Sequence, residues 1–224
     1  MKTLLPLSLL CIALGSGSPG QAQQLRSPQM DVSHEVKLPQ LTQQASLIVE
    51  GRPTAFRSFW NREHTSIYTA TTIEVYRVFK GEVTGSNVEL ITYGGWVGET
   101  GMSSTTNVKL DEHTVGLFFL KPSQQPSEGS TLASNQVGEL AYGQQGFIRY
   151  SGDQAEQYAA FSKFRVYPDV EKSLYVLLQQ ETGKVYRTKK AFDVTRYDQV
   201  QERLTGVNAA TKTLPAAPID TKKS

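Results

Sequence analysis

The sequence predicts a mainly β (α+β) protein: a small OB-like antiparallel barrel, closed or partly closed, with one or two helices at its C-terminal end. Two observations lead to this prediction. Short segments rich in β-branched and aromatic residues recur between residues 47 and 150, and glycine-containing turns separate them. After Pro168 the apolar residues change from strand-like alternation to helical spacing.

The first predicted elements lie between residues 38 and 60. Residues 38–45 (LPQLTQQA) predict one or two helical turns. The apolar residues 47–49 then open a strand that continues toward Phe59 and Trp60. Pro53 falls inside this strand, and because proline donates no ladder hydrogen bond, an edge or a bulge is expected there.

Three further strands follow. Residues 67–79 (IYTATTIEVYRVF) form the clearest strand pattern of the chain, since β-branched and aromatic residues dominate them. Residues 87–93 predict a third strand. Residues 115–120 (VGLFFL) predict a fourth, and because this segment is apolar on both faces, we expect it to be central.

The C-terminal half predicts a hairpin and then helices. Residues 139–142 and 146–150 are expected to pair around a glycine-containing turn. A helix is expected to start after Pro168 and to end at Gly183, and residues 197–204 predict a second, short helix. The apolar positions of the first helix recur at helical spacing: Val170, Leu174, Leu177 and Leu178.

The N-terminal 22 residues are typical of a secretory signal peptide. Lys2 precedes an apolar run of about ten residues, which is too short to span a membrane, and the small residues Gly20 and Ala22 follow. Cleavage is expected near Ala22. The protein is therefore expected to be secreted, into the periplasm or the extracellular space.

The rest of the chain divides into three parts. Residues 23–37 predict a flexible leader, residues 38–204 the barrel domain with its C-terminal helices, and residues 205–224 a disordered tail or linker rich in Ala, Pro, Thr and Lys. Such a linker is also typical of the front module of a multidomain extracellular protein.

Charge and cysteine content exclude several classes of function. The chain has 23 basic and 21 acidic residues, and the expected signal peptide contains one basic residue and no acidic one, which leaves a mature net charge of +1. This balance gives no reason to expect nucleic acid or an anionic membrane as a partner. The one cysteine, Cys11, lies in the signal peptide, so we expect no disulfide or thiol chemistry in the mature chain. We also expect the mature protein to be a monomer without a cofactor.

Catalytic motifs are missing from the sequence. It contains no GxSxG and no phosphate-binding loop, and the HExxH zinc motif fails because Leu38 follows His34-Glu35 where the second histidine is required. His64 and His113 lie in two polar turns beside acidic residues. They either meet as a metal site of an enzyme or are solvated residues at separate hairpin tips, and the second interpretation is favoured.

The most distinctive local feature is residues 93–98 (YGGWVG), directly after the third strand. Glycines beside Trp96 permit a tight turn that presents a large amphipathic side chain. Trp96 is either an exposed anchor of a binding loop or folds back to close the end of the barrel, and the same two interpretations apply to Trp60. The site hypothesis is that Tyr93, Trp96 and Trp60 bind a protein or a glycan.

Several segments have the order and character of a known module: Ala45–Gly51, Ser58–Trp60, Ile67–Thr69, Val75–Gly81, Gly94–Gly98, Val115–Leu120 and Pro168–Tyr186. Over roughly residues 38–200 the chain resembles the N-terminal β-barrel module of secreted Bacteroidota proteins. In that family, Ig-like domains, a matrixin-type metalloprotease domain or a type IX secretion sorting domain often follow the module. The resemblance implies a barrel with a helical end. It transfers no catalytic residue, because the zinc helix of the protease has no counterpart in this sequence.

Three functional hypotheses follow from the sequence. The favoured one is a secreted, non-enzymatic binding or accessory module. The second is a protease inhibitor that inserts a loop or its N-terminus into an active site, as small barrels can do. The third is a metal-dependent enzyme that uses His64 and His113.

Overall fold

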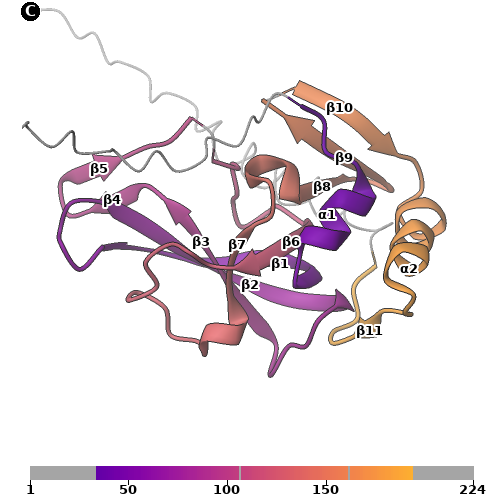
Figure 1. Ribbon diagram of the computed structural model, residues 1–224, viewed down its shortest axis with the longest axis horizontal. Helices are drawn as coiled ribbons and strands as arrows, with labels where there is room; N and C mark the ends of the chain where they lie inside the picture. Colours follow the sequence, from indigo (N-terminus) through magenta and orange to yellow (C-terminus); the bar gives the residue numbers. More distant parts are fainter. Residues whose placement is uncertain (1–33, 106, 161, 194–224) are drawn as a thin grey trace, which may run out of the picture. The chain divides into compact units, whose positions relative to one another are not determined.

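Five strands form a partly closed ring in the computed structural model, which describes residues 34–105, 107–160 and 162–193 (Figure 1). Their order is β1–β2–β3–β7–β6, and β6 pairs with β1 to close the ring. Every contact in the ring is antiparallel except that between β3 and β7. The predicted OB-like barrel is therefore confirmed. The ring strands are β1 (Leu47–Trp60), β2 (Ile67–Lys80), β3 (Asn87–Tyr93), β6 (Gly116–Pro122) and β7 (Val137–Leu140).

Pro53 lies at an irregularity of β1, as predicted. The pairing of β1 with β2 shifts register between Pro53 and Ala55, because proline cannot donate to the ladder. The small strands β4 (Gly95–Val97) and β5 (Thr100–Met102) follow β3 and form a separate two-stranded sheet.

The predicted hairpin between residues 139–142 and 146–150 is wrong. Strands β7 and β8 (Phe147–Ser151) both pair with β6, through Leu120↔Leu140 and Phe118↔Phe147. A 3₁₀ turn, η2 (Gly143–Gly146), interrupts what is otherwise one path along β6, and it begins where Tyr142 has a φ of 57°. The glycines do mark a turn. After it, however, the chain pairs with β6 again and does not fold back on β7.

Beyond β8 the sheet continues through two strands that were not predicted, β9 (Gln154–Ala159) and β10 (Ser162–Tyr167). Two further short elements belong to the described part: η1 (Ser134–Gln136) lies before β7, and the strand β11 (Arg187–Thr188) pairs with β2 after the C-terminal helix. The last residues of the expected leader are also described, and Val36 among them is buried, with its backbone N–H donating to Gln145 at 2.7 Å.

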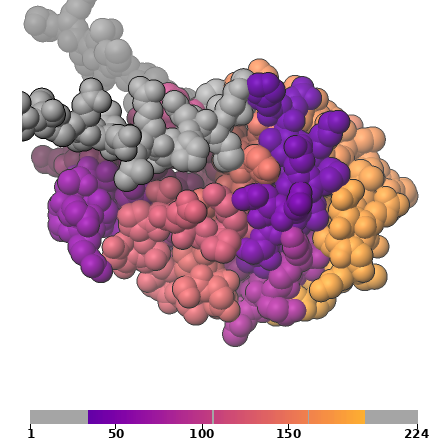
Figure 2. All heavy atoms as spheres, viewed as in Figure 1, coloured from indigo at the N-terminus to yellow at the C-terminus, as the bar shows by residue number. Residues whose placement is uncertain are grey.

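Helices α1 (Leu38–Gln44) and α2 (Val176–Thr182) lie against the barrel, and α2 continues a π-helical turn, η3 (Glu171–Tyr175). Gly183 ends α2 with a φ of 64°, as predicted. Leu177 is exposed and Tyr175 is buried in its place, since the π turn changes which side chains face the barrel. The two helices contact each other, and Figure 2 shows the two ends of the described chain side by side on the surface.

Within the described part of the chain, neither helix is long and apolar enough to cross a membrane. The other sequence predictions outside this part, which are the signal peptide, most of the leader, the short helix 197–204 and the tail, concern residues that the structure does not describe.

Two apolar layers share strand β6. Phe118 and Leu120 lie in a cluster with residues of all the other ring strands, which is the barrel interior. Leu117 and Phe119 lie in a second cluster with residues of α1 and of the C-terminal helix, which is the layer between barrel and helices. The prediction that this strand is central is confirmed, because both of its faces are buried.

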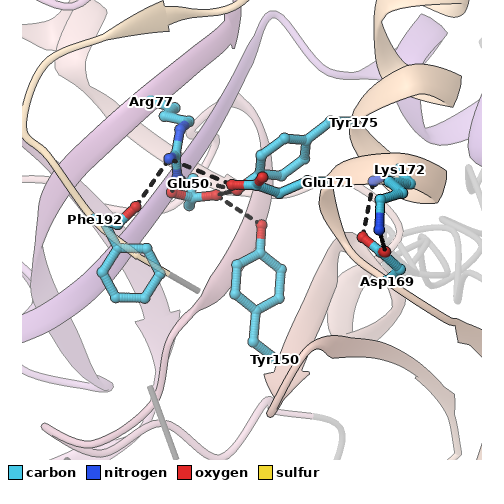
Figure 3. A network of polar contacts seen from close by, with 8 residues as sticks. All are labelled: Glu50, Arg77, Tyr150, Asp169, Glu171, Lys172, Tyr175 and Phe192. Atoms are coloured by element: carbon cyan, nitrogen blue, oxygen red, sulfur yellow. Dashed lines mark hydrogen bonds and ion pairs between the residues drawn. The ribbon is translucent and has the colours of Figure 1, made fainter. Parts of the chain in front are cut away.

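A network of polar side chains crosses this second layer (Figure 3). The fully buried carboxylate of Glu50 on β1 accepts hydrogen bonds from Arg77 Nη1 at 2.5 Å, from the Tyr150 hydroxyl at 2.9 Å and from the Tyr175 hydroxyl. Burial raises the pKa of the Glu50 carboxyl, and Arg77 and the two phenols oppose that shift. The network joins β1, β2, β8 and η3 at one carboxylate.

The segment after α2 closes the outer side of this network. Arg77 Nη2 donates to the carbonyl oxygen of Phe192 at 2.9 Å, and the Phe192 ring stacks on Tyr76 with centroids 4.5 Å apart. The backbone N–H groups of Lys189 and Lys190 donate to the Tyr76 carbonyl. Residues 187–192 therefore act as a strap that holds the ion pair away from water.

We expect Glu50→Gln to lower the free energy of unfolding by about 3–5 kcal/mol, because it removes the buried counter-charge of Arg77 and leaves only the exposed carboxylate of Glu171, at 3.9 Å. Urea unfolding followed by circular dichroism measures this. The matched control is Glu82→Gln, which removes the carboxylate of an exposed ion pair with Arg187 and should leave the midpoint unchanged. Equal midpoints for both variants would contradict the structural role of Glu50.

Stability should also fall at alkaline pH. Burial and the neighbouring Glu50 raise the pKa values of Tyr150 and Tyr175 above their ordinary value of 10.0. A raised pKa in the folded state means that the stabilisation is complete below about pH 10 and is lost as the pH rises further. Above pH 10 the free energy of unfolding should fall less steeply with pH in Tyr175→Phe than in the parent, by about 1.4 kcal/mol per pH unit. Equal slopes in urea titrations of the two proteins would refute the assignment.

Candidate functional site: an exposed tryptophan platform

Two consecutive glycines direct the chain from β3 into the β4–β5 hairpin. Gly94 and Gly95 have φ angles of 94° and 135°, which side-chain-bearing residues rarely adopt. A Cβ atom on Gly95 would overlap with the hydroxyl groups of Ser58 and Thr69. These hydroxyls hold the start of the hairpin, because Thr69 Oγ1 donates to the Gly94 carbonyl at 2.7 Å and Trp96 N–H donates to Ser58 Oγ at 3.2 Å.

Trp96 lies on the outer face of the hairpin and is 72% exposed. It is opposite Gly101 in the β4–β5 register. A Cβ atom on Gly101 would come within 2.7–2.8 Å of three atoms spread across the six-membered ring, Cε2, Cδ2 and Cη2. The indole therefore lies with one face on the backbone of Gly101 and presents the other face to solvent. Trp96 is therefore exposed and does not fold back to close the end of the barrel, whereas its role as a binding anchor stays a prediction.

Tyr93 belongs to a row of aromatic rings across three neighbouring strands. Its ring packs edge-on against Tyr68 at a centroid distance of 5.5 Å and an angle of 88°, and Tyr68 lies 6.2 Å from Phe59. Phe59 in turn packs over Gly129 in the β6–β7 connection. Tyr93 is 37% exposed at the open end of this row, so the row supports this end of the barrel and exposes one edge.

Trp60 is half-buried at the tip of β1 and is not an exposed anchor like Trp96. Its ring stacks on the imidazole of His64, with centroids 6.0 Å apart and an angle of 21°. The structure thus places Tyr93, Trp96 and Trp60 at the ends of β1, β3 and the adjoining hairpin, with Trp96 the most exposed of the three.

Charges of both signs surround the aromatic row. Burial raises the pKa of Tyr68, and Tyr93 and the carboxylates of Glu128 and Glu63 add to this effect. The exposed side chains of Arg57 and Arg62 lie near the same end of β1.

The two turn histidines lie in separate places. His64 is in the β1–β2 turn, whereas His113 precedes β6 and donates its backbone N–H to Asp111. Because Gly51 pairs with Gly116, His113 lies near the middle of β1, whereas His64 lies beyond the tip of β1 at Trp60. Among the described residues, no group of three or more His, Cys, Asp or Glu could hold a metal ion.

Sequence reasoning singled out Trp96 but missed the residues that orient it. Gly101 carries no sequence signal of its own, because its importance comes from its position opposite Trp96. Ser58 and Thr69 are ordinary polar residues of strands until the two glycines approach them. A glycine directly opposite an aromatic residue on the neighbouring strand would have indicated this seat. Sequence alone does not reveal such a pair, because the register of the hairpin must be known first.

No protein-family model, curated protein or solved structure matches this chain. The resemblance to the Bacteroidota module therefore stays a prediction.

Gly101→Ala should displace the Trp96 indole from its seat. The φ of Gly101 is not in the positive range, so the substitution tests the space under the ring and not the backbone. In a Trp60→Phe background Trp96 is the one tryptophan left, and acrylamide should quench its fluorescence more strongly after Gly101→Ala because both ring faces meet water. Val185→Ala, at a 73% exposed side chain beyond α2, serves as the control. Unchanged quenching would contradict the stacked geometry.

Proposed function

We propose that this protein is a secreted, non-enzymatic binding module that holds a glycan on the Trp96 platform. The observation that carries the proposal is an indole fixed on Gly101 by one face and open to solvent on the other. The expected signal peptide supports the compartment, and the resemblance to a front module of secreted proteins supports an accessory role beside another domain.

An exposed tryptophan of this kind has an energetic cost. Burial of its apolar surface would contribute on the order of 3 kcal/mol, at about 25 cal/mol per Å². The glycines at 94, 95 and 101 instead hold the ring outward, although a folded-back tryptophan would bury more surface. Because the ring is already immobilised, a ligand that stacks on it loses little additional conformational entropy.

The flat seat favours a glycan over a protein partner. A tryptophan that anchors a protein interface inserts into a pocket that surrounds the ring, whereas Gly101 already covers one face of Trp96. The free face suits a flat, ring-shaped ligand, since the C–H groups of a pyranose carry partial positive charge and the ring face is negative. Nucleic-acid bases also stack on aromatic rings, but the near-neutral net charge expected of the mature chain gives no reason to expect a polyphosphate partner.

The test is retention of the secreted chain on a panel of insoluble polysaccharides: cellulose, chitin, xylan and mannan. We expect one or more to retain it, and Trp96→Ala to weaken retention at least tenfold, which corresponds to the loss of an anchor residue. Val185→Ala is the matched control, because Val185 is 73% exposed and lies beyond α2, away from the hairpin.

Retention of Trp96→Ala equal to that of the parent would remove Trp96 from the site. Absence of retention on every polysaccharide, with circular dichroism showing a folded protein, would refute a glycan as the partner.

A further inference from the structure

A second site lies on the outer part of the sheet, apart from the Trp96 platform. A cavity of about 230 Å³ opens between strands β8 and β9, the turn η2 and the segment that leads from β5 to β6. Its lining combines apolar and cationic side chains: Val108, Lys109, Gln144, Phe147, Arg149 and Tyr158.

The apolar half of the cavity is rigid. Phe147 is only 3% exposed, and its ring packs on Phe118 of the barrel interior with centroids 4.6 Å apart. Ile148 pairs with Gln157 in the antiparallel register, so Phe147 and Tyr158 lie opposite each other on one face of β8 and β9. With Val108 they provide two aromatic surfaces and an aliphatic one for a small apolar body.

The other half is cationic. The carboxylates of Asp111 and Glu156 act on Arg149 electrostatically, but in the described part of the chain neither forms an ion pair with it. Arg149 Nη2 donates to the Lys109 carbonyl at 2.8 Å, which fixes the guanidinium at the cavity. Within the described part of the chain, no carboxylate lies within ion-pair distance of Arg149 or of Lys109. The carboxylates that do form ion pairs in that part form them with other lysines and arginines: Glu50, Glu74, Glu82, Glu89, Glu139, Glu156, Asp169 and Glu171.

The nearest acidic groups are already engaged. Glu156, opposite Arg149 in the strand register, accepts from Lys163 at 2.8 Å and from the Tyr158 hydroxyl at 2.6 Å. Asp111 accepts from the Thr114 hydroxyl at 2.7 Å and from the backbone N–H of His113. Two cations therefore face the cavity without a carboxylate that is directed at them.

We infer that this cavity binds a small organic carboxylate with a ring or a short apolar body. The body would lie between Phe147 and Tyr158, and the carboxylate would accept hydrogen bonds from the remaining N–H groups of Arg149 and from Lys109. A volume of about 230 Å³ corresponds to roughly eight atoms, at the ~30 Å³ of a liquid water molecule. That size fits one ring with one carboxylate, and the site is independent of the proposed glycan platform.

Benzoate is a suitable probe, and benzamide is its uncharged counterpart of the same shape. In amide NMR spectra of the folded protein, benzoate should shift the signals of residues around the cavity, with a dissociation constant in the millimolar range as expected for so small a ligand. Benzamide should bind at least about tenfold more weakly. Added salt should weaken benzoate binding, because the attraction is between charges.

Arg149→Gln should weaken benzoate binding at least about tenfold, and Lys109→Gln, at an exposed side chain that does not affect folding, should weaken it to a smaller degree. Arg62→Gln, at an exposed arginine of the β1–β2 turn, should leave it unchanged. The inference is overturned if benzamide binds as well as benzoate, if the shifted signals lie away from the cavity, or if no signal shifts up to about 20 mM benzoate.

Discussion

The buried carboxylate of Glu50 is the point at which distant parts of the chain are held together. It receives hydrogen bonds from a side chain 27 residues away on β2, and from others 100 and 125 residues away on β8 and η3. Because an unpaired charge in an apolar layer is so unfavourable, these four stretches are stable only together. The C-terminal helix and the strap over Arg77 are thus required parts of the barrel and not an appendage to it.

The surfaces that we consider functional lie away from this network. Figure 1 places the β4–β5 hairpin at one end of the described chain and α2 at the other. The connection between β3 and β6 supplies both Trp96 with its glycine seat and the Val108–Lys109 wall of the anion cavity. The barrel supplies the fixed parts beneath them: Ser58 and Thr69 under the hairpin, and Phe147 under the cavity. A rigid barrel with varied connections is how small β domains commonly carry binding sites.

Patterns within single segments predicted much of the fold correctly. The ring strands β1, β2, β3 and β6, the irregularity at Pro53 and the helix end at Gly183 follow from local periodicity and from backbone limits of proline and glycine. Strands β9 and β10 escaped prediction because their sequences, QAEQYA and SKFRVY, lack a dense β-branched pattern, and they form by adding to β8. The false hairpin arose because a turn signal does not say which strand the chain meets after it.

For the site, the glycines of residues 93–98 predict a sharp turn around a tryptophan, since glycine tolerates the backbone angles found at 94 and 95. Glu50 and Arg77 stand in two predicted strands, but no pattern singled them out as buried charges or as partners. That these charges meet, that Trp96 rests on Gly101 and faces solvent, and that Arg149 and Phe147 line one cavity depends on the tertiary structure. The reason is physical: a side chain's surroundings depend on strand register and on packing between segments far apart in the chain, and local preference does not specify either.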